Sequence, residues 1–178
     1  MKIKSNGLVI DKKQLNGSKN DEGSFIVSNN GFLYVAGSTL SNDGDFNHPL
    51  KDQDSFLIKL DYNLCFVEYY DIGKIGNDNI DKLIITNDIY YVLNHYTSGH
   101  KETKICEFSF FSEKVKEVDL AFYGYVSTLD FIFFKGNLYY ACYVDEALRI
   151  YEIDKNNNTK IVYSTFMEKY LEDLIIII

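Results

Sequence analysis

The pattern Gly31-Phe-Leu-Tyr-Val-Ala-Gly-Ser-Thr39 returns twice more along the chain in imperfect copies. When the copies are aligned without a gap, Gly31, Asp88 and Gly136 coincide, each between two apolar runs. Glycine adopts positive φ readily and aspartate forms Asx turns, so each position predicts a tight turn between two strands. An internal period of this kind predicts a repeat architecture in which each unit buries its apolar faces against its neighbours.

Each repeat contains four short runs of alternating apolar character, separated by turns that carry Asn, Asp or Gly. The units are predicted at about 25–71, 83–120 and 129–165. A period of roughly 40 to 60 residues suits a propeller blade, which is built from four strands. The prediction is therefore an all-β fold, a propeller-like array of three four-stranded antiparallel blades within a single domain, 1–178.

Partial blades are expected at both ends of the chain. Residues 1–15 resemble the outer strands of a blade, and 166–178 contain Asp173-Leu-Ile-Ile-Ile, which resembles the Asp81-Lys-Leu-Ile-Ile that begins the second unit. The expected architecture is thus an incomplete or open propeller. Uncovered blade faces and unpaired strand edges favour association, so self-association is one predicted interaction.

The charge and hydropathy of the chain exclude several classes of partner. A formal net charge of −8 opposes binding to DNA, RNA or anionic lipid, which depends on clustered Lys and Arg. No segment approaches the roughly 20 apolar residues of a membrane-spanning helix. No apolar stretch of the secretory type follows Lys2 and Lys4. We therefore predict no nucleic-acid partner and no membrane insertion.

The cysteines and histidines form no recognisable site. Cys65, Cys106 and Cys142 lack Cys-x-x-Cys spacing and are predicted as buried, unpaired thiols within strands. His95 and His100 lack the spacing of a zinc site. Both, like His48, are predicted to lie in surface loops. There is no Gly-x-Ser-x-Gly elbow, although catalytic triads assemble from residues distant in sequence. No catalytic residue is predicted.

A polar insertion over residues 40–53 distinguishes the first unit from the others. Loops held by a rigid scaffold are where binding residues concentrate. This insertion is therefore the predicted binding loop, with its candidate residues Asn42, Asp43, Asp45, Phe46 and His48.

The same loop carries a candidate calcium site. Asp43, Asp45 and Asn47 alternate, and Asp54 follows where a calcium-binding loop places its last carboxylate. However, His48 occupies the position where an EF-type loop needs glycine, and Asp is a shorter ligand than Glu. The residues favour a solvated, Asx-rich turn, with calcium as the alternative, and no other cofactor is predicted.

The segments Gly31–Thr39 and Asp54-Ser-Phe-Leu-Ile-Lys-Leu-Asp61 resemble the bacterial β-propeller repeats known as SBBP repeats, and the loop Ser41–Phe46 resembles one found in related surface proteins. The match covers residues 17–78; the later units keep the Tyr-bearing strand but lose most glycines, and the Trp common in the outer strand is absent. The resemblance implies a propeller that is secreted or exposed on the cell surface and acts as a scaffold or adhesive module. It implies no catalytic residues.

The predicted function is a non-enzymatic scaffold or binding module that meets a protein or a glycan through loops such as 40–53. Two alternatives remain: a fragment of a larger propeller hydrolase or lyase, and a truncated product without independent function. The compartment also stays open, because the resemblance implies an extracellular or surface location whereas the missing signal favours the cytoplasm.

Overall fold

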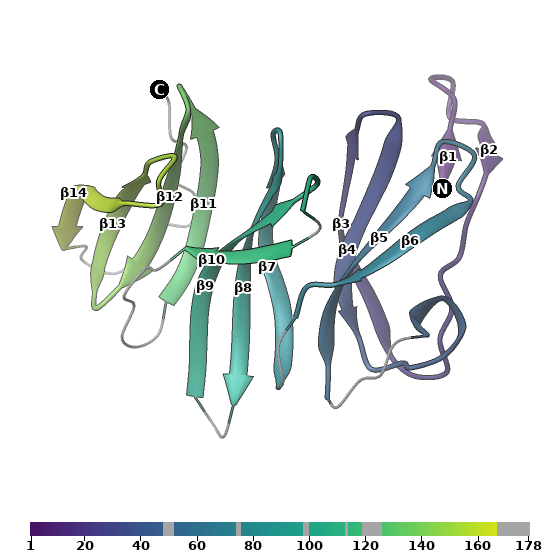
Figure 1. Cartoon of the computed structure of the whole chain (residues 1–178), viewed down its shortest axis with the longest axis horizontal. Helices are drawn as coiled ribbons and strands as arrows, with labels where there is room; N and C mark the ends of the chain where they lie inside the picture. Colours follow the sequence, from purple (N-terminus) through teal and green to yellow (C-terminus); the bar gives the residue numbers. More distant parts are fainter. Residues whose placement is uncertain (48–51, 74–75, 98–99, 113, 119–125, 167–178) are drawn as a thin grey trace. The chain divides into compact units, whose positions relative to one another are not determined.

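The fold is all-β in the part of the chain that the computed structural model describes, namely residues 1–47, 52–73, 76–97, 100–112, 114–118 and 126–166. These residues form one two-stranded and three four-stranded sheets, all antiparallel (Figure 1). Their only helical segment is the 3-10 turn η1 (Gly44–Phe46). The prediction of an all-β chain built from four-stranded units is confirmed.

By contacts, the chain divides into two compact units. The first contains residues 1–80 together with 95–97, and the second contains residues 81–94 and 98–178. The β8 strand (Ile89–Thr97) therefore contributes its end, which carries His95, to the first unit.

A short hairpin opens the first unit, where sequence analysis expected the outer strands of a partial blade. It pairs β1 (Lys2–Ile3) with β2 (Val9–Asp11). The Lys2 Nζ donates a hydrogen bond to the carbonyl oxygen of Tyr62 at 3.0 Å, which ties the hairpin to the turn that follows β5 (Asp54–Asp61). The other expected partial blade, 166–178, lies outside the described residues except for Phe166.

The three four-stranded sheets keep their strands in chain order. The first consists of β3 (Asp21–Asn29), β4 (Phe32–Thr39), β5 and β6 (Phe66–Asp71). The second consists of β7 (Asn77–Ile85), β8, β9 (His100–Ser109) and β10 (Lys114–Val118). The third consists of β11 (Val126–Phe134), β12 (Asn137–Val144), β13 (Ala147–Ile153) and β14 (Thr159–Phe166). Each sheet begins several residues before the unit predicted for it.

The turns predicted at Gly31 and Gly136 have the geometry that the sequence implies. Asn30 and Gly31 have φ of 46° and 85°, and Lys135 and Gly136 have φ of 48° and 85°. Two central residues with positive φ define a type I′ turn, whose twist matches that of the strands it joins. The repeat is also visible in an irregularity, because β3 and β11 each carry a bulge, between Gly23 and Phe25 and between Thr128 and Asp130 respectively.

Each compact unit has its own apolar core. In the first unit, Phe56, Ile58 and Leu60 on β5 pack with Phe46 from η1 and with Leu15. In the second unit, the core joins residues of the second and third sheets, including Val92, Ile105, Phe131, Leu138 and Tyr140. Alternation along β5 and β12 thus directs one face of each strand into a core, as the sequence pattern predicts.

The prediction for the cysteines is right for two of them and wrong for Cys65. Cys106 on β9 and Cys142 on β12 are buried, whereas Cys65 is exposed. Cys65 lies in the turn before β6, where Leu64 has a φ of 62° and occupies the buried position with 7% exposure. The turn therefore buries the leucine and leaves the adjacent thiol in solvent.

Candidate binding site at the 40–53 loop

The carboxylates of the 40–53 loop are held by the chain segment that precedes β3. Asp43 Oδ1 accepts a hydrogen bond from the backbone N–H of Ser18 at 2.8 Å. Asp45 Oδ2 accepts one from the N–H of Asn16 at 2.9 Å, and Asp45 Oδ1 accepts one from Lys13 Nζ at 3.2 Å. Charge-assisted bonds of this kind are stronger than neutral ones, so they fix the two segments against each other.

A buried polar cluster lies at the base of the loop. Thr39 Oγ1 donates to Asp21 Oδ1 at 2.5 Å, and Ser41 Oγ donates to Asp21 Oδ2 at 3.1 Å. Ser41 Oγ also accepts a hydrogen bond from the N–H of Lys19 at 2.9 Å. A Cβ added at Gly17 would overlap the Ser41 side chain, so only glycine fits there. The cluster makes the loop base rigid in the absence of any ligand.

These two sets of contacts border a pocket of about 690 Å³. Its lining is mostly polar and comes from the 14–22 segment, from Ser38 on β4 and from both ends of the 40–53 loop. Six of the polar residues are Gln14, Asn16, Asn20, Asp21, Glu22 and Gln53. Amide groups both donate and accept hydrogen bonds, whereas the carboxylates only accept them. The pocket is thus equipped to bind an uncharged molecule with many hydroxyl groups.

Gln53 connects this pocket to the start of β7. Its Nε2 donates to Ser38 Oγ at 2.8 Å. Its backbone N–H donates to Asn77 Oδ1 at 3.2 Å, and its carbonyl oxygen accepts from the N–H of Asp78 at 2.8 Å. The far wall of the pocket is therefore anchored to the next strand of the first unit.

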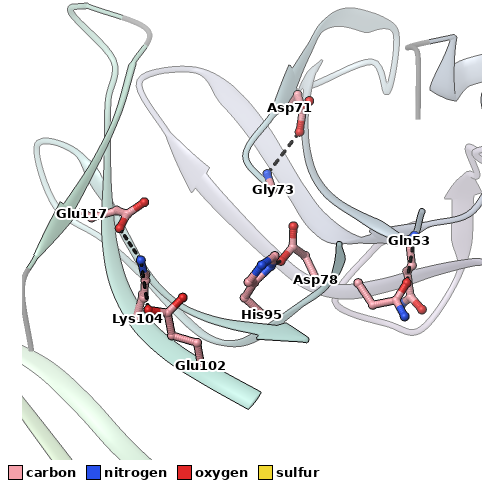
Figure 2. Close-up of polar contacts among 9 residues, drawn as sticks. Gln53, Asp71, Gly73, Asp78, His95, Glu102, Lys104 and Glu117 are labelled. Carbon is pink, nitrogen blue, oxygen red and sulfur yellow. Dashed lines mark hydrogen bonds and ion pairs between the residues drawn. The ribbon is translucent and has the colours of Figure 1, made fainter. Parts of the chain in front are cut away.

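Next to Gln53, Asp78 forms a buried pair with His95. The Nδ1 atom of His95 lies 2.6 Å from Asp78 Oδ1, and the two side chains are 9% and 0% exposed (Figure 2). Gly73 allows the close approach of the chain, because a Cβ there would lie 2.7 Å from Asp78 Oδ2. A carboxylate beside an imidazole is the arrangement that orients a general base. Here, however, the low exposure of the His95 side chain leaves little surface for a substrate.

The prediction of surface-loop histidines is wrong for His95. It lies within β8 and is buried, and its Nδ1 atom forms a hydrogen bond with the Asp78 carboxylate on the neighbouring β7. His100 is exposed but begins β9 instead of lying in a loop, and His48 falls outside the described residues. Nothing in the local sequence indicates the pairing of residues 78 and 95, because it arises from the packing of two strands.

The predicted loop residues are divided between several environments. Asn42 is exposed, whereas Phe46 is 1% exposed and packs edge-on against Phe56, with ring centroids 5.0 Å apart. Of the four proposed calcium ligands, Asp43 and Asp45 accept the hydrogen bonds described above. The other two are Asn47, directly after η1, and Asp54, which is buried at the start of β5 opposite Thr39. Calcium binding stays a prediction; within the described ranges, no three His, Cys, Asp or Glu residues are grouped as metal ligands.

A second cavity, of about 440 Å³, also borders the loop. It is lined by Gly44, Asp45, Asn47, Phe66 and Tyr69. Burial raises the pKa of Tyr69 well above its usual value, with Asp71, Asp54 and Asp21 adding to the effect, so its hydroxyl remains protonated. Asp45 lines this second cavity. It also accepts a hydrogen bond from the backbone N–H of Asn16, which lines the first pocket.

Comparison with known proteins adds no assignment. A scan against protein-family models found no matching family, and searches of curated proteins and of solved structures found no match. In the described ranges, no helix has the length and apolar character needed to cross a bilayer.

Proposed function

We propose that this chain is a non-enzymatic binding module with a propeller-type fold, whose polar pocket holds a glycan. The observation that carries the proposal is the pocket of about 690 Å³ lined with amide and carboxylate groups. Sugar hydroxyls donate and accept hydrogen bonds at once, and this lining offers partners for both roles. Small-molecule sites typically have volumes of about 300 to 1,000 Å³, and the pocket lies within that range.

The charge of the lining favours a neutral ligand. Lys19 is accompanied by the carboxylates of Asp21 and Glu22, and the chain as a whole has a formal charge of −8. An anionic polymer would be repelled by this field, whereas a neutral glycan would not.

The rigidity of the pocket also supports binding. The contacts of Asp21, Asp43 and Asp45 hold residues 41–45 against the 14–22 segment. A site that is ordered in advance loses less conformational entropy when it binds, so more of the contact energy becomes affinity.

The propeller-type fold is supported by the repetition of four-stranded antiparallel sheets whose strands follow chain order. The resemblance of residues 17–78 to SBBP repeats points the same way and suggests a location outside the cell or on its surface. In such a fold, the 40–53 loop extends from the scaffold at a position suited to meeting a ligand.

The proposal is tested by screening the labelled chain on a glycan array and measuring the affinity of each hit by calorimetry. Asn20→Ala and Glu22→Ala remove two polar groups from the pocket and are expected to weaken binding by about tenfold each. Asn63→Ala, in an exposed turn of the same unit, serves as the matched control and is expected to bind like the unaltered chain.

Absence of any glycan binding, or affinities that neither pocket variant changes, would contradict the proposal. Cleavage of a bound glycan would favour the alternative of a propeller enzyme instead. Circular dichroism of each variant establishes that the fold is intact.

A further inference from the structure

The second cavity owes its aromatic wall to a one-residue bulge in β6. Along the β5–β6 ladder, Phe66 pairs with Leu60 and Glu68 pairs with Lys59, so Val67 has no partner. Side chains normally alternate between the faces of a strand, and a spacing of three would place Phe66 and Tyr69 on opposite faces. The bulge at Val67 shifts the alternation by one residue. Phe66 and Tyr69 therefore lie on the same face of the sheet as their partners Leu60 and Ile58.

The two aromatic rings differ in how they are held. Tyr69 stacks on Phe56 with ring centroids 6.5 Å apart and an interplanar angle of 26°, and Phe56 in turn contacts Phe46. Phe66 is 42% exposed and lines the same cavity. The wall therefore combines a ring locked by the core with a ring whose surface is available to a ligand.

The polar part of the lining comes from η1 and the residue that follows it. The Asp45 carboxylate is oriented by Lys13 Nζ and by the N–H of Asn16. A Cβ at Gly44, where φ is 62°, would overlap the carbonyl oxygen of Asn16, which shows how closely this turn packs. Asn47 adds an amide that can donate and accept.

A cavity lined by aromatic rings, a carboxylate and an amide matches the chemistry of a pyranose ring. One face of a pyranose carries C–H groups and packs on an aromatic ring, while its hydroxyl groups project from the edge towards polar partners. A volume of about 440 Å³ accommodates a small molecule of this size.

We propose that the cavity between Phe66 and Asn47 is a stacking subsite for a neutral hexopyranose unit. This inference rests on the proposed function, because it assigns a second subsite to a glycan-binding module. Asp45, which lines this cavity, accepts a hydrogen bond from the backbone N–H of Asn16, which lines the polar pocket.

The test uses the whole chain and the methyl glycosides of glucose, galactose, mannose and N-acetylglucosamine. Their affinities are measured by calorimetry, and saturation-transfer NMR reports which sugar protons approach the protein. Phe66→Ala and Asn47→Ala are each expected to weaken binding by about tenfold, whereas Phe66→Trp retains it because an aromatic face remains. Phe111→Ala is the matched control, since Phe111 is 99% exposed in the other unit.

The outcomes separate the subsite from the polar pocket. If Phe66→Ala binds like the unaltered chain while Asn20→Ala weakens binding, the subsite is wrong and the proposed function stands. If Phe66→Ala weakens binding while Asn20→Ala and Glu22→Ala do not, the subsite stands and the polar pocket is wrong.

Two further results would overturn the subsite. If none of the four glycosides binds the unaltered chain, the hexopyranose assignment fails, and the array decides separately whether the polar pocket takes another glycan. If Phe66→Ala instead lowers the molar mass measured by light scattering, with sugar affinity unchanged, the Phe66 surface contacts a second copy of the chain.

Discussion

The Nδ1 atom of His95 lies 2.6 Å from Oδ1 of Asp78, between two neighbouring strands that bury both side chains. At this distance the two atoms share one proton, which Nδ1 carries when the carboxylate is ionised and therefore accepts the hydrogen bond. The pair therefore joins β7 to the end of β8 at the point where Gln53 also bonds to the backbone of Asp78.

Replacement of Asp78 by alanine is expected to lower the free energy of unfolding by about 1 to 3 kcal/mol, because the buried imidazole N–H loses its acceptor. Asp78→Asn keeps an acceptor oxygen and should destabilise the protein less. Urea denaturation followed by circular dichroism measures both. Asp52→Ala, at an exposed carboxylate of the same unit, is the control. Equal stabilities for Asp78→Ala and the control would show that the pair contributes nothing.

The three thiols are expected to differ in reactivity. Cys65 is exposed, whereas Cys106 and Cys142 are buried, and burial raises the pKa of Cys142 to about 12. Because the thiolate is the reactive form, a disulfide reagent at about pH 8 should modify Cys65 quickly and the other two only on unfolding. Cys65→Ser should abolish the fast phase. Rapid reaction of more than one thiol in the native protein would contradict the burial of the other two.

Gly37 is expected to tolerate no side chain. A Cβ there would overlap the backbone carbonyl oxygen of Glu22, whereas a Cβ on Gly23, its partner in the ladder, would meet nothing closer than 3.9 Å. Gly37→Ala should therefore destabilise the protein by about 1 to 3 kcal/mol through overpacking. Gly23→Ala should be neutral or slightly stabilising. Thermal unfolding of the two variants side by side decides the matter; similar melting temperatures would be inconsistent with the packing.

Stability is expected to fall in alkaline solution, in part through Tyr90. Burial, followed by Glu107 and Asp88, raises the pKa of Tyr90 to about 12, and the ring stacks on Phe133 with centroids 6.0 Å apart. An unfolded tyrosine has a pKa of about 10. Between these two pKa values the unfolded chain loses a proton that the folded chain retains. The contribution of Tyr90 to the free energy of unfolding is therefore complete below about pH 10 and is lost as the pH rises towards about 12.

Tyr90→Phe removes the titrating hydroxyl, and its stability should decline less steeply over that interval. Urea midpoints measured across the interval test this, with the exposed Tyr163→Phe on β14 as the control. A decline as steep in Tyr90→Phe as in the unaltered chain would exclude the assigned role.

Much of the fold could be predicted from sequence because its signals are local. Asn30-Gly31 specifies its turn through positive φ at both residues, and the alternation along β5 specifies which side chains enter the core. The β3 strand begins at Asp21, earlier than the start of about residue 25 predicted for the first unit. Asp21, Glu22 and Gly23 carry no apolar side chain, yet they belong to the strand because their backbone pairs with β4, an effect that side-chain patterns do not report.

The candidate site was predicted only as a loop. Its walls come from the 14–22 segment, the base of the 40–53 loop and β6, which are brought together by tertiary contacts such as that of Asp45 with Asn16. The alternating Asp43 and Asp45 suggested a cation, whereas the structure shows their carboxylates accepting backbone N–H groups. Carboxylates at this spacing can bind a cation or accept backbone hydrogen bonds. Only the position of the 14–22 segment, which the local sequence does not specify, distinguishes the two roles.

The bulges in β3 and β11 bear on how each sheet could meet another chain. Their unpaired residues, Ser24 and Leu129, precede Gly31 and Gly136 by the same interval. Both strands stand at the edge of their sheet, and an edge strand can offer unpaired backbone groups to a strand of a second chain. A bulge bends and twists its strand, so each of these edges is a poorer template for such pairing.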